Sequence, residues 1–157
     1  MSQPHALQPS NVNPPYDIML TRKILDLAEA ESKVLCDSAG AIVSFIGTTR
    51  NTHIKKNVLR LEYEAHEVLV SKVLTALCAH AIQQFDLKKI CLYHRLGSLN
   101  VGEVSVIIAV SSAHRAAAFE GCRYLIDSLK VSAPIWKKEY YADGSEPAWV
   151  GPDGKPV

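Results

Sequence analysis

The hydrophobic residues of this chain change their spacing at about residue 66, and this change constrains the fold more than any other feature of the sequence. Between Val58 and Ala65 apolar and polar residues alternate, which is typical of a half-exposed antiparallel strand. Between Glu67 and Phe85 apolar residues recur at intervals of three and four, which predicts an amphipathic helix. Since hairpins are also expected, we predict the α+β class, with a mostly antiparallel sheet packed against helices, rather than a doubly wound α/β fold.

The other segments predict further strands and two more helices. Strands are expected at residues 16–20, 41–46, 89–96, 104–110 and 135–141, with a short return strand around Trp149. We expect the strand at 41–46 to form a hairpin with the strand at 58–65, with its tip near Lys55. The strand at 104–110 is apolar on both faces and should be central in its sheet.

Capping residues and prolines set the expected ends of the helices. Thr21 is a candidate cap for a short helix that carries Leu25 and Leu27, and Ser111 or Ser112 can cap the last long helix. Pro134 should end that helix at or just before Ala133. Its expected buried stripe consists of Phe119, Cys122, Leu125, Ile126 and Leu129.

The length of 157 residues suits one domain with a hydrophobic core. We expect a disordered tail at residues 1–15, the domain at 16–150 and a flexible tail at 151–157. No apolar run approaches the roughly 18 residues of a membrane span, and the first residues lack the features of a secretory signal. The four cysteines form no Cys-x-x-Cys pair, which argues against a metal site and favours reduced core thiols in a cytoplasmic protein.

Positive charge is local in this sequence. Lys and Arg number 17 against 16 Asp and Glu, so the net charge is +1. Lys130 and Lys137 nevertheless flank one short segment, and the pair His114-Arg115 lies one helix upstream. A small anion fits this pattern better than a nucleic acid, which would need a broad basic surface.

His114 and Arg115 begin a helix, where free N–H groups and the helix dipole favour an anion, although a structural pairing with Glu120 is an alternative. Lys130 ends that helix, where it can simply complement the dipole. An apolar wall around Trp136 would instead desolvate its amine and make it reactive. Lys137 and Lys138 must point to opposite faces of their strand, so we place Lys137 in the pocket and Lys138 on its rim.

The segment Gly47-Thr48-Thr49-Arg50 resembles an anion-binding loop, with Gly47 permitting an unusual backbone angle, but it lacks the spacing of a P-loop. The pair His94-Arg95 is interpreted as structural or part of an interface. The helix from Arg115 to Leu129 should be roughly 20 Å long, so one small ligand cannot touch both of its ends. We therefore expect a two-fold homodimer in which His114 and Arg115 of one subunit complete the pocket of the other.

Four motifs together resemble the catalytic (large) subunit of molybdopterin synthase, in its eukaryotic form. The match runs from about Gly40 to Trp149. The motifs are Gly47-Thr48-Thr49-Arg50-Asn51, His94-Arg95-Leu96-Gly97, Ser112-Ala113-His114-Arg115 and the stretch from Leu129 to Glu139 that contains Pro134-Ile135-Trp136-Lys137-Lys138.

The resemblance implies an α/β-hammerhead element and a homodimer within a heterotetramer, in which each large subunit holds one small ubiquitin-like sulfur-carrier subunit. It implies sulfur transfer from the carrier's C-terminal Gly-Gly thiocarboxylate to cyclic pyranopterin monophosphate, with no metal or other cofactor. The family's catalytic lysines match Lys130 and Lys137. Its substrate-binding positions match Thr48, Thr49, Arg50, His114, Arg115, Lys130, Lys137, Lys138 and Glu139.

A non-catalytic anion-binding or scaffold subunit of a carrier-protein complex is the alternative function. Such a subunit would keep Arg50 and Arg115 but would not require Lys130. Either function involves a protein partner and a small molecule, and neither involves nucleic acid or a membrane.

Overall fold

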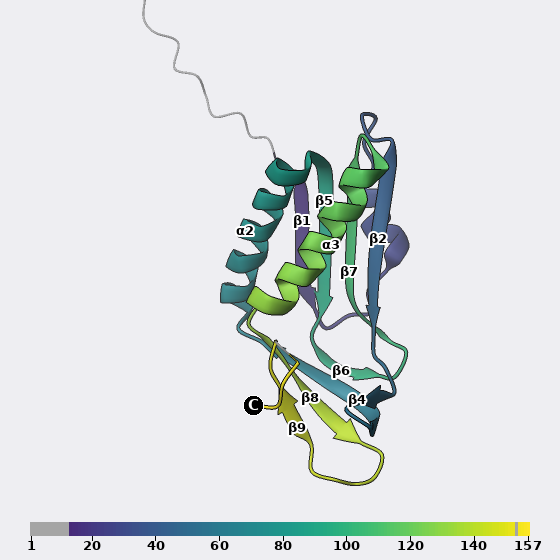
Figure 1. Ribbon diagram of the computed structural model, residues 1–157, viewed down its shortest axis with the longest axis vertical. Coiled ribbons are helices and arrows are strands. Elements are labelled where there is room, and N and C mark those ends of the chain that lie inside the picture. Colours follow the sequence, from purple (N-terminus) through teal and green to yellow (C-terminus); the bar gives the residue numbers. More distant parts are fainter. Residues whose placement is uncertain (1–12, 153) are drawn as a thin grey trace, which may run out of the picture.

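The computed structural model of this protein describes residues 13–152 and 154–157. Its helices lie between groups of strands along the chain, as Figure 1 shows. The strands are β1 (Tyr16–Thr21), β2 (Ala41–Thr48), β3 (Thr52–His53), β4 (Lys56–Ala65), β5 (Leu87–Arg95), β6 (Gly97–Asn100), β7 (Val104–Ser112), β8 (Ile135–Tyr141) and β9 (Ala148–Val150). The helices are α1 (Leu27–Lys33), α2 (Glu67–Phe85) and α3 (Arg115–Ser132).

The larger sheet has the strand order β1-β5-β7-β2. Strand β1 runs parallel to β5, while β7 is antiparallel to both β5 and β2. Helices α2 and α3 cover one face, and α1 packs on the other face against β5 and β7 (Figure 1). The main core lies under α2 and α3, where Leu74, Ile108 and Leu125 are fully buried. The predicted α+β class and the central position of β7 are confirmed.

Helix α2 is long and apolar enough to cross a membrane by length and composition alone. Its stripe of Val70, Leu74, Cys78 and Ala81 is buried, however, and the helix packs against β1, β5 and α3. One stripe of α2 therefore packs into the domain while most of its other residues are exposed or half-buried, as in an amphipathic helix that covers a sheet.

The smaller sheet lies beyond one end of the larger one (Figure 1) and is built around β4. Strands β3, β6 and β8 pair with β4, and β9 pairs with β8, all antiparallel. Helix α3 ends at Ser132, one residue before the cap Ala133, and Pro134 leads directly into β8. The predicted stop at Pro134 is confirmed, and it is this short connection that places the end of α3 beside the smaller sheet.

The hairpin prediction was right about the tip and wrong about the partner. Ile54 and Lys55 form the turn with left-handed backbone angles (φ 45° and 62°), but the strand that returns from it pairs with β3. Strand β2 pairs with β7 in the other sheet. One face of β2 packs against the main core under α3 through Ala41, Val43 and Phe45, while Ile42 and Ile46 are each 41% exposed. The run of apolar residues alone could not show which strand β2 would pair with.

The N-terminal caps of α1 and α3 are residues other than the predicted ones. Helix α1 begins at Leu27 and is capped by Asp26, whose carboxylate accepts hydrogen bonds from the N–H groups of Ala28 and Glu29. Thr21 instead accepts from the N–H of Lys23 in the preceding turn. His114 holds the N-cap position of α3, and Ser112 Oγ accepts from the N–H of His114 without occupying that position.

Two side-chain expectations also need correction. Phe119 is 63% exposed, although Cys122, Leu125, Ile126 and Leu129 form the predicted buried stripe. Leu59, which the alternation places on one face with Leu61 and Tyr63, is exposed because the pairing of β4 with β8 shifts between Val58 and Arg60, so that Val58 points inward with Leu61.

The expectation that Gly47 permits an unusual backbone angle is wrong, because glycine is needed there to avoid a clash with the neighbouring strand. The φ of Gly47 does not fall in the left-handed region, but a Cβ there would lie 2.6 Å from Val106 Cγ1 on the neighbouring strand.

The domain boundaries stay a prediction. Residues 1–12 lie outside the described part of the chain. At the other end, Gly151 N–H donates to the carbonyl of Lys155, and Val157 N–H donates to the carbonyl of Trp149. The described residues after β9 therefore turn back onto that strand and bring Gly151 and Pro152 close to the junction of the two sheets.

Candidate active site

A pocket of about 200 Å³ lies where the smaller sheet meets the end of the larger one. Its walls come from the ends of β2 and α3, from β4, β5 and β8, and from the segment after β9. Five of the predicted site residues line it: Thr48, Arg50, Lys130, Lys137 and Glu139. The structure thus brings together residues that are up to 91 positions apart in the printed sequence.

The two lysines reach the pocket from different elements. Lys130 lies in the last turn of α3 and is exposed at the pocket, while Lys137 lies on β8, two residues before Glu139. Residues two apart on a strand share a face, so the side chains of Lys137 and Glu139 point the same way. The predicted proximity of Lys130 and Lys137 is supported by their shared pocket.

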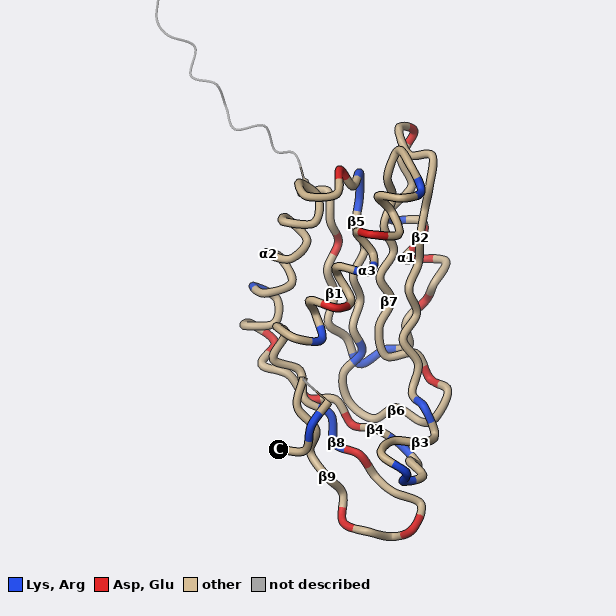
Figure 2. Tube along the Cα trace, in the orientation of Figure 1, with Lys and Arg blue, Asp and Glu red and all other residues tan. Residues whose placement is uncertain are grey.

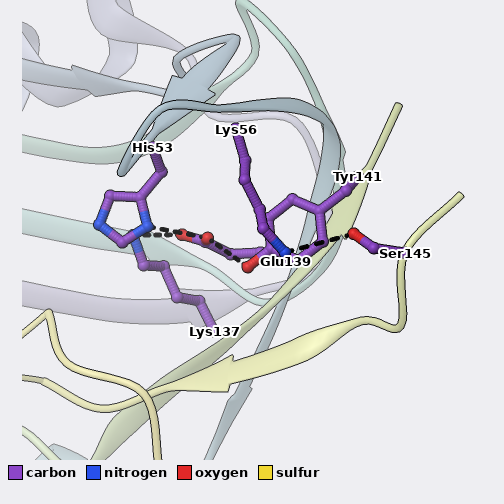
Figure 3. Close-up of polar contacts among 6 residues, drawn as sticks. All are labelled: His53, Lys56, Lys137, Glu139, Tyr141 and Ser145. Carbon is purple, nitrogen blue, oxygen red and sulfur yellow. Dashed lines mark hydrogen bonds and ion pairs between the residues drawn. The ribbon is translucent and has the colours of Figure 1, made fainter. Parts of the chain in front are cut away.

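Glu139 is a buried carboxylate with three partners (Figure 3). Its side chain is 1% exposed, and its Oε1 lies 3.1 Å from Lys137 Nζ. His53 Nδ1 donates to Oε2 at 2.8 Å, and the Tyr141 hydroxyl donates to the same oxygen at 3.1 Å. A buried charge is tolerated when it is paired and hydrogen-bonded, and these contacts meet that requirement.

Burial on its own would raise the pKa of Glu139, but the hydrogen bonds and positive charges of His53 and Lys137 outweigh it. The net result is a pKa below the ordinary value for a glutamate. Glu139 is therefore ionised at neutral pH, and its charge offsets that of Lys137.

The loop after β2 contributes its residues unequally. Thr48 and Arg50 line the pocket, but Thr49 is only 3% exposed and turns into the protein. The backbone of Thr49 bonds to Glu103 and Gly102 in the turn before β7. We infer that Thr49 fixes the loop, while Arg50 presents the positive charge.

Lys138 points away from this pocket. Its Nζ lies 5.5 Å from the Trp149 ring and 5.7 Å from the Tyr140 ring, on the opposite face of β8 from Lys137. The prediction that Lys137 and Lys138 point to opposite faces of β8 is confirmed, but Lys138 does not lie on the rim of the pocket. Because strand side chains alternate, Lys138 cannot touch a ligand held between Lys137 and Arg50 of the same chain.

His114 holds the N-cap position of α3 and Arg115 is the first residue of the helix, so both lie at the far end of the helix from Lys130. They do not line the pocket of this chain. The geometric problem predicted from the sequence is therefore present in the fold, since one small ligand cannot reach both ends of the helix.

The pocket also contains residues that were not predicted as part of the site, among them His53, Tyr63 and His94. His53 gave no signal, because it lies in a polar loop and acquires its role through a contact 86 positions away. Tyr63 shares its strand face with Leu61, and this alternation could have placed it inward.

His94 was interpreted as structural or part of an interface together with Arg95. Arg95 does have a structural role, since it pairs with Glu103 at 3.4 Å. His94 is instead 4% exposed and lines the pocket.

The surrounding charge is mixed rather than uniformly basic. Figure 2 shows Lys and Arg near β3 and β8 interspersed with Asp and Glu. The described residues contain no group of three or more His, Cys, Asp or Glu arranged to hold a metal ion. Three cysteines, Cys78, Cys91 and Cys122, are buried, and burial raises the pKa of their thiols; Cys36 is half-buried. The prediction of core thiols is confirmed for these three cysteines and wrong for Cys36.

Comparisons with known proteins agree with the motifs. The family model described as MoaE protein matches residues 20–132. The molybdopterin synthase catalytic subunit of Dictyostelium discoideum is 45% identical over 136 residues, which cover 85% of this chain and 86% of that protein. The human molybdopterin synthase catalytic subunit is 44% identical over 134 residues, covering 85% and 70%.

Solved structures share the fold. The crystal structure of molybdopterin synthase from Staphylococcus aureus superposes with a TM-score of 0.79 at 29% identity, covering 84% of this chain and 95% of that one. The molybdopterin biosynthesis MoaE protein of Burkholderia ambifaria has a TM-score of 0.70 at 29% identity, covering 86% and 88%. From its motifs, its fold and these relatives, the chain belongs to the MoaE protein family, that of the molybdopterin synthase catalytic subunits.

Proposed function

We propose that this protein is a sulfurtransferase that converts cyclic pyranopterin monophosphate to molybdopterin. The observation that carries the proposal is the pocket in which Arg50, Lys130 and Lys137 converge from three separate elements. Sulfur would come from the C-terminal thiocarboxylate of a small ubiquitin-like carrier subunit, so the protein needs no cysteine of its own at the site. The burial of Cys78, Cys91 and Cys122 is consistent with this.

The charges of the pocket suit both reactants. The substrate phosphate and the carrier thiocarboxylate are anions, and Arg50 and Lys130 are exposed cations at the pocket. Arg donates through a planar fork that matches phosphate oxygens. We assign phosphate binding to Arg50, together with His114 and Arg115 of a second subunit in a homodimer, and we assign the carrier tail to Lys130 and Lys137.

In each transfer the thiocarboxylate sulfur replaces an oxygen substituent on a carbon of the pterin side chain, and water then cleaves the acyl–sulfur bond to the carrier. The sulfur stays on the pterin and the carrier leaves with a carboxylate, so two carriers are consumed per product. As the thiocarboxylate attacks, Lys130 serves as general base or as a stabiliser of the developing charge. A nucleophilic role for Lys130 toward the acyl end of the carrier is the alternative. Cytoplasmic location and the heterotetramer with two carriers belong to the same proposal.

The test is incubation of the purified protein with cyclic pyranopterin monophosphate and a thiocarboxylated carrier, followed by detection of the dithiolene product. Carrier that ends in an ordinary carboxylate is the matched control and should give no product. Binding of the thiocarboxylated carrier without any dithiolene would instead support the scaffold function.

A further inference from the structure

His94 offers a hydrogen-bond acceptor to the pocket. The ring is 4% exposed, and its Nδ1 lies 2.9 Å from the carbonyl oxygen of Arg95. A carbonyl oxygen can only accept, so Nδ1 carries the proton and Nε2 of the neutral ring keeps a lone pair. Because Nδ1 is turned to the backbone and His94 lines the pocket, Nε2 is the ring atom available there.

The position of this acceptor is fixed by its neighbours. Tyr63 packs against the His94 ring in an edge-on arrangement with 5.2 Å between centroids. Within residues 13–152 and 154–157, no group donates a hydrogen bond to Nε2 of His94. This acceptor faces the pocket, so it is placed for a donor that enters the pocket or swings into it.

Lys130 is a donor in the same pocket. Its positive charge acts on the His94 ring, and no carboxylate of the described chain lies within ion-pair distance of its Nζ. Lys137 differs, because its Nζ is 3.1 Å from Glu139. His53, another imidazole of the pocket, already donates to Glu139.

We propose that His94 is a positioning residue for Lys130: when the Lys130 side chain turns into the pocket, its amine donates a hydrogen bond to Nε2 of the neutral His94 ring. The pocket then contains two different lysines. Lys137 shares its charge with the buried carboxylate of Glu139, whereas Lys130 is oriented by an uncharged acceptor and has no carboxylate partner among the described residues. Lys130 and Arg50 are consequently the net cations that meet the incoming anions.

The protonation of His94 agrees with this role. Burial lowers its pKa, the hydrogen bond to Arg95 partly opposes this, and the charge of Lys130 lowers it further, to about 4. The ring is therefore neutral at physiological pH, as an acceptor for an ammonium group must be. A charged imidazole at this place would repel Lys130.

The contact can be tested without turnover. The ring of His94 is labelled with ¹⁵N, and its Nε2 resonance is compared in the wild-type protein and in Lys130→Ala by NMR. Lys130 is exposed, so this substitution should preserve the fold. We expect the Nε2 resonance to shift and the Nδ1 resonance to stay. An unchanged Nε2 resonance overturns the proposal.

The positioning role of His94 is tested by two substitutions, each of which keeps the hydrogen-bonding group of one ring nitrogen. Asn at position 94 can keep the donor to the Arg95 carbonyl but lacks an atom at Nε2, while Gln can reach the Nε2 position with an acceptor. We expect His94→Asn to lower kcat roughly 10- to 100-fold with a smaller change in KM, because a misplaced catalytic group costs about that much. His94→Gln should recover part of the loss.

The matched control is His80→Asn, which removes an exposed histidine of α2 that does not line the pocket. It should leave kcat unchanged. Wild-type kcat in His94→Asn, or equal losses in the Asn and Gln variants, would contradict the role. The kinetic experiment rests on the proposed function, but the NMR experiment does not. If the wild-type protein makes no product, the proposed function fails, and the NMR comparison still tests the contact between His94 and Lys130.

Discussion

Arg115 is the first residue of α3 and Lys130 lies in the last turn of the same helix, so their side chains leave opposite ends of a rod roughly 20 Å long. The pocket contains only Lys130 of these two. If both residues serve one reaction, they must come from two chains related by symmetry.

A mixture of two inactive variants tests this arrangement. Lys130→Ala and Arg115→Ala chains are unfolded together, refolded and assayed with the thiocarboxylated carrier. In a two-fold dimer, random pairing restores one intact site in each mixed dimer, so we expect roughly a quarter of the wild-type activity. Each variant refolded alone is the control, and a mixture no more active than either of them would exclude the shared site.

Lys130 should be needed for turnover rather than for stability. General acid–base groups contribute about 100- to 10,000-fold to rate, so Lys130→Ala should lower kcat by at least about 100-fold. The side chain is exposed, so the free energy of unfolding should change by no more than about 0.5 kcal/mol. Single-turnover kinetics and urea unfolding measure the two quantities. Normal turnover in Lys130→Ala would remove both the general-base and the nucleophile roles.

Gly47 should resist substitution because of its close approach to β7. A Cβ at Gly47 would lie 2.6 Å from Val106 Cγ1, and such overpacking costs about 1–3 kcal/mol. We expect Gly47→Ala to lower the urea midpoint accordingly. Adding Val106→Ala removes the clashing methyl group, so the two substitutions together should cost less than the sum of their separate effects. Strict additivity would argue against the clash.

His94 should make stability depend on pH in the weakly acidic range. Its pKa falls from an ordinary 6.5 to about 4 on folding, because burial disfavours the charged ring. The unfolded chain therefore binds a proton below pH 6.5 while the folded protein does not. The contribution of His94 is fully present above pH 6.5 and is lost as pH falls toward 4, with a size on the order of 3 kcal/mol.

The non-titrating variant His94→Gln isolates this contribution. Urea unfolding of both proteins from pH 4 to 7.5 gives the difference in their free energies of unfolding. We expect that difference to favour the wild type less as the pH falls. Parallel pH profiles for the two proteins would show that His94 is not buried in the neutral form.

Much of the secondary structure followed from the spacing of apolar residues. Helix α2 has the predicted bounds, because a stripe such as Val70-Leu74-Cys78-Ala81 has the period of a helix whatever surrounds it. Pro134 set the end of α3 through a steric rule that acts between adjacent residues. The opposite directions of the Lys137 and Lys138 side chains followed in the same way, because successive side chains of a strand alternate between its two faces.

The wrong predictions concern residues whose environment is set by segments far away in the chain. Phe119 matched the helical stripe, but it lies beyond the surface that the sheet covers and is exposed. The shifted pairing between Val58 and Arg60 turned Leu59 outward, and a bulge of this kind depends on the partner strand β8. Spacing along one segment carries no information about which strand that segment will pair with.

The sequence by itself determined the α+β class, the elements around Lys130 and Lys137, and the separation of Lys130 from Arg115, because these depend on local periodicity and on the rise of a helix. Only the tertiary structure decided that β2 and β4 lie in different sheets, that Glu139 is buried between His53 and Lys137, and that His94 faces the pocket. Those relationships arise from contacts between segments far apart in the chain, where burial and hydrogen bonding select among pairings that the residue pattern permits equally.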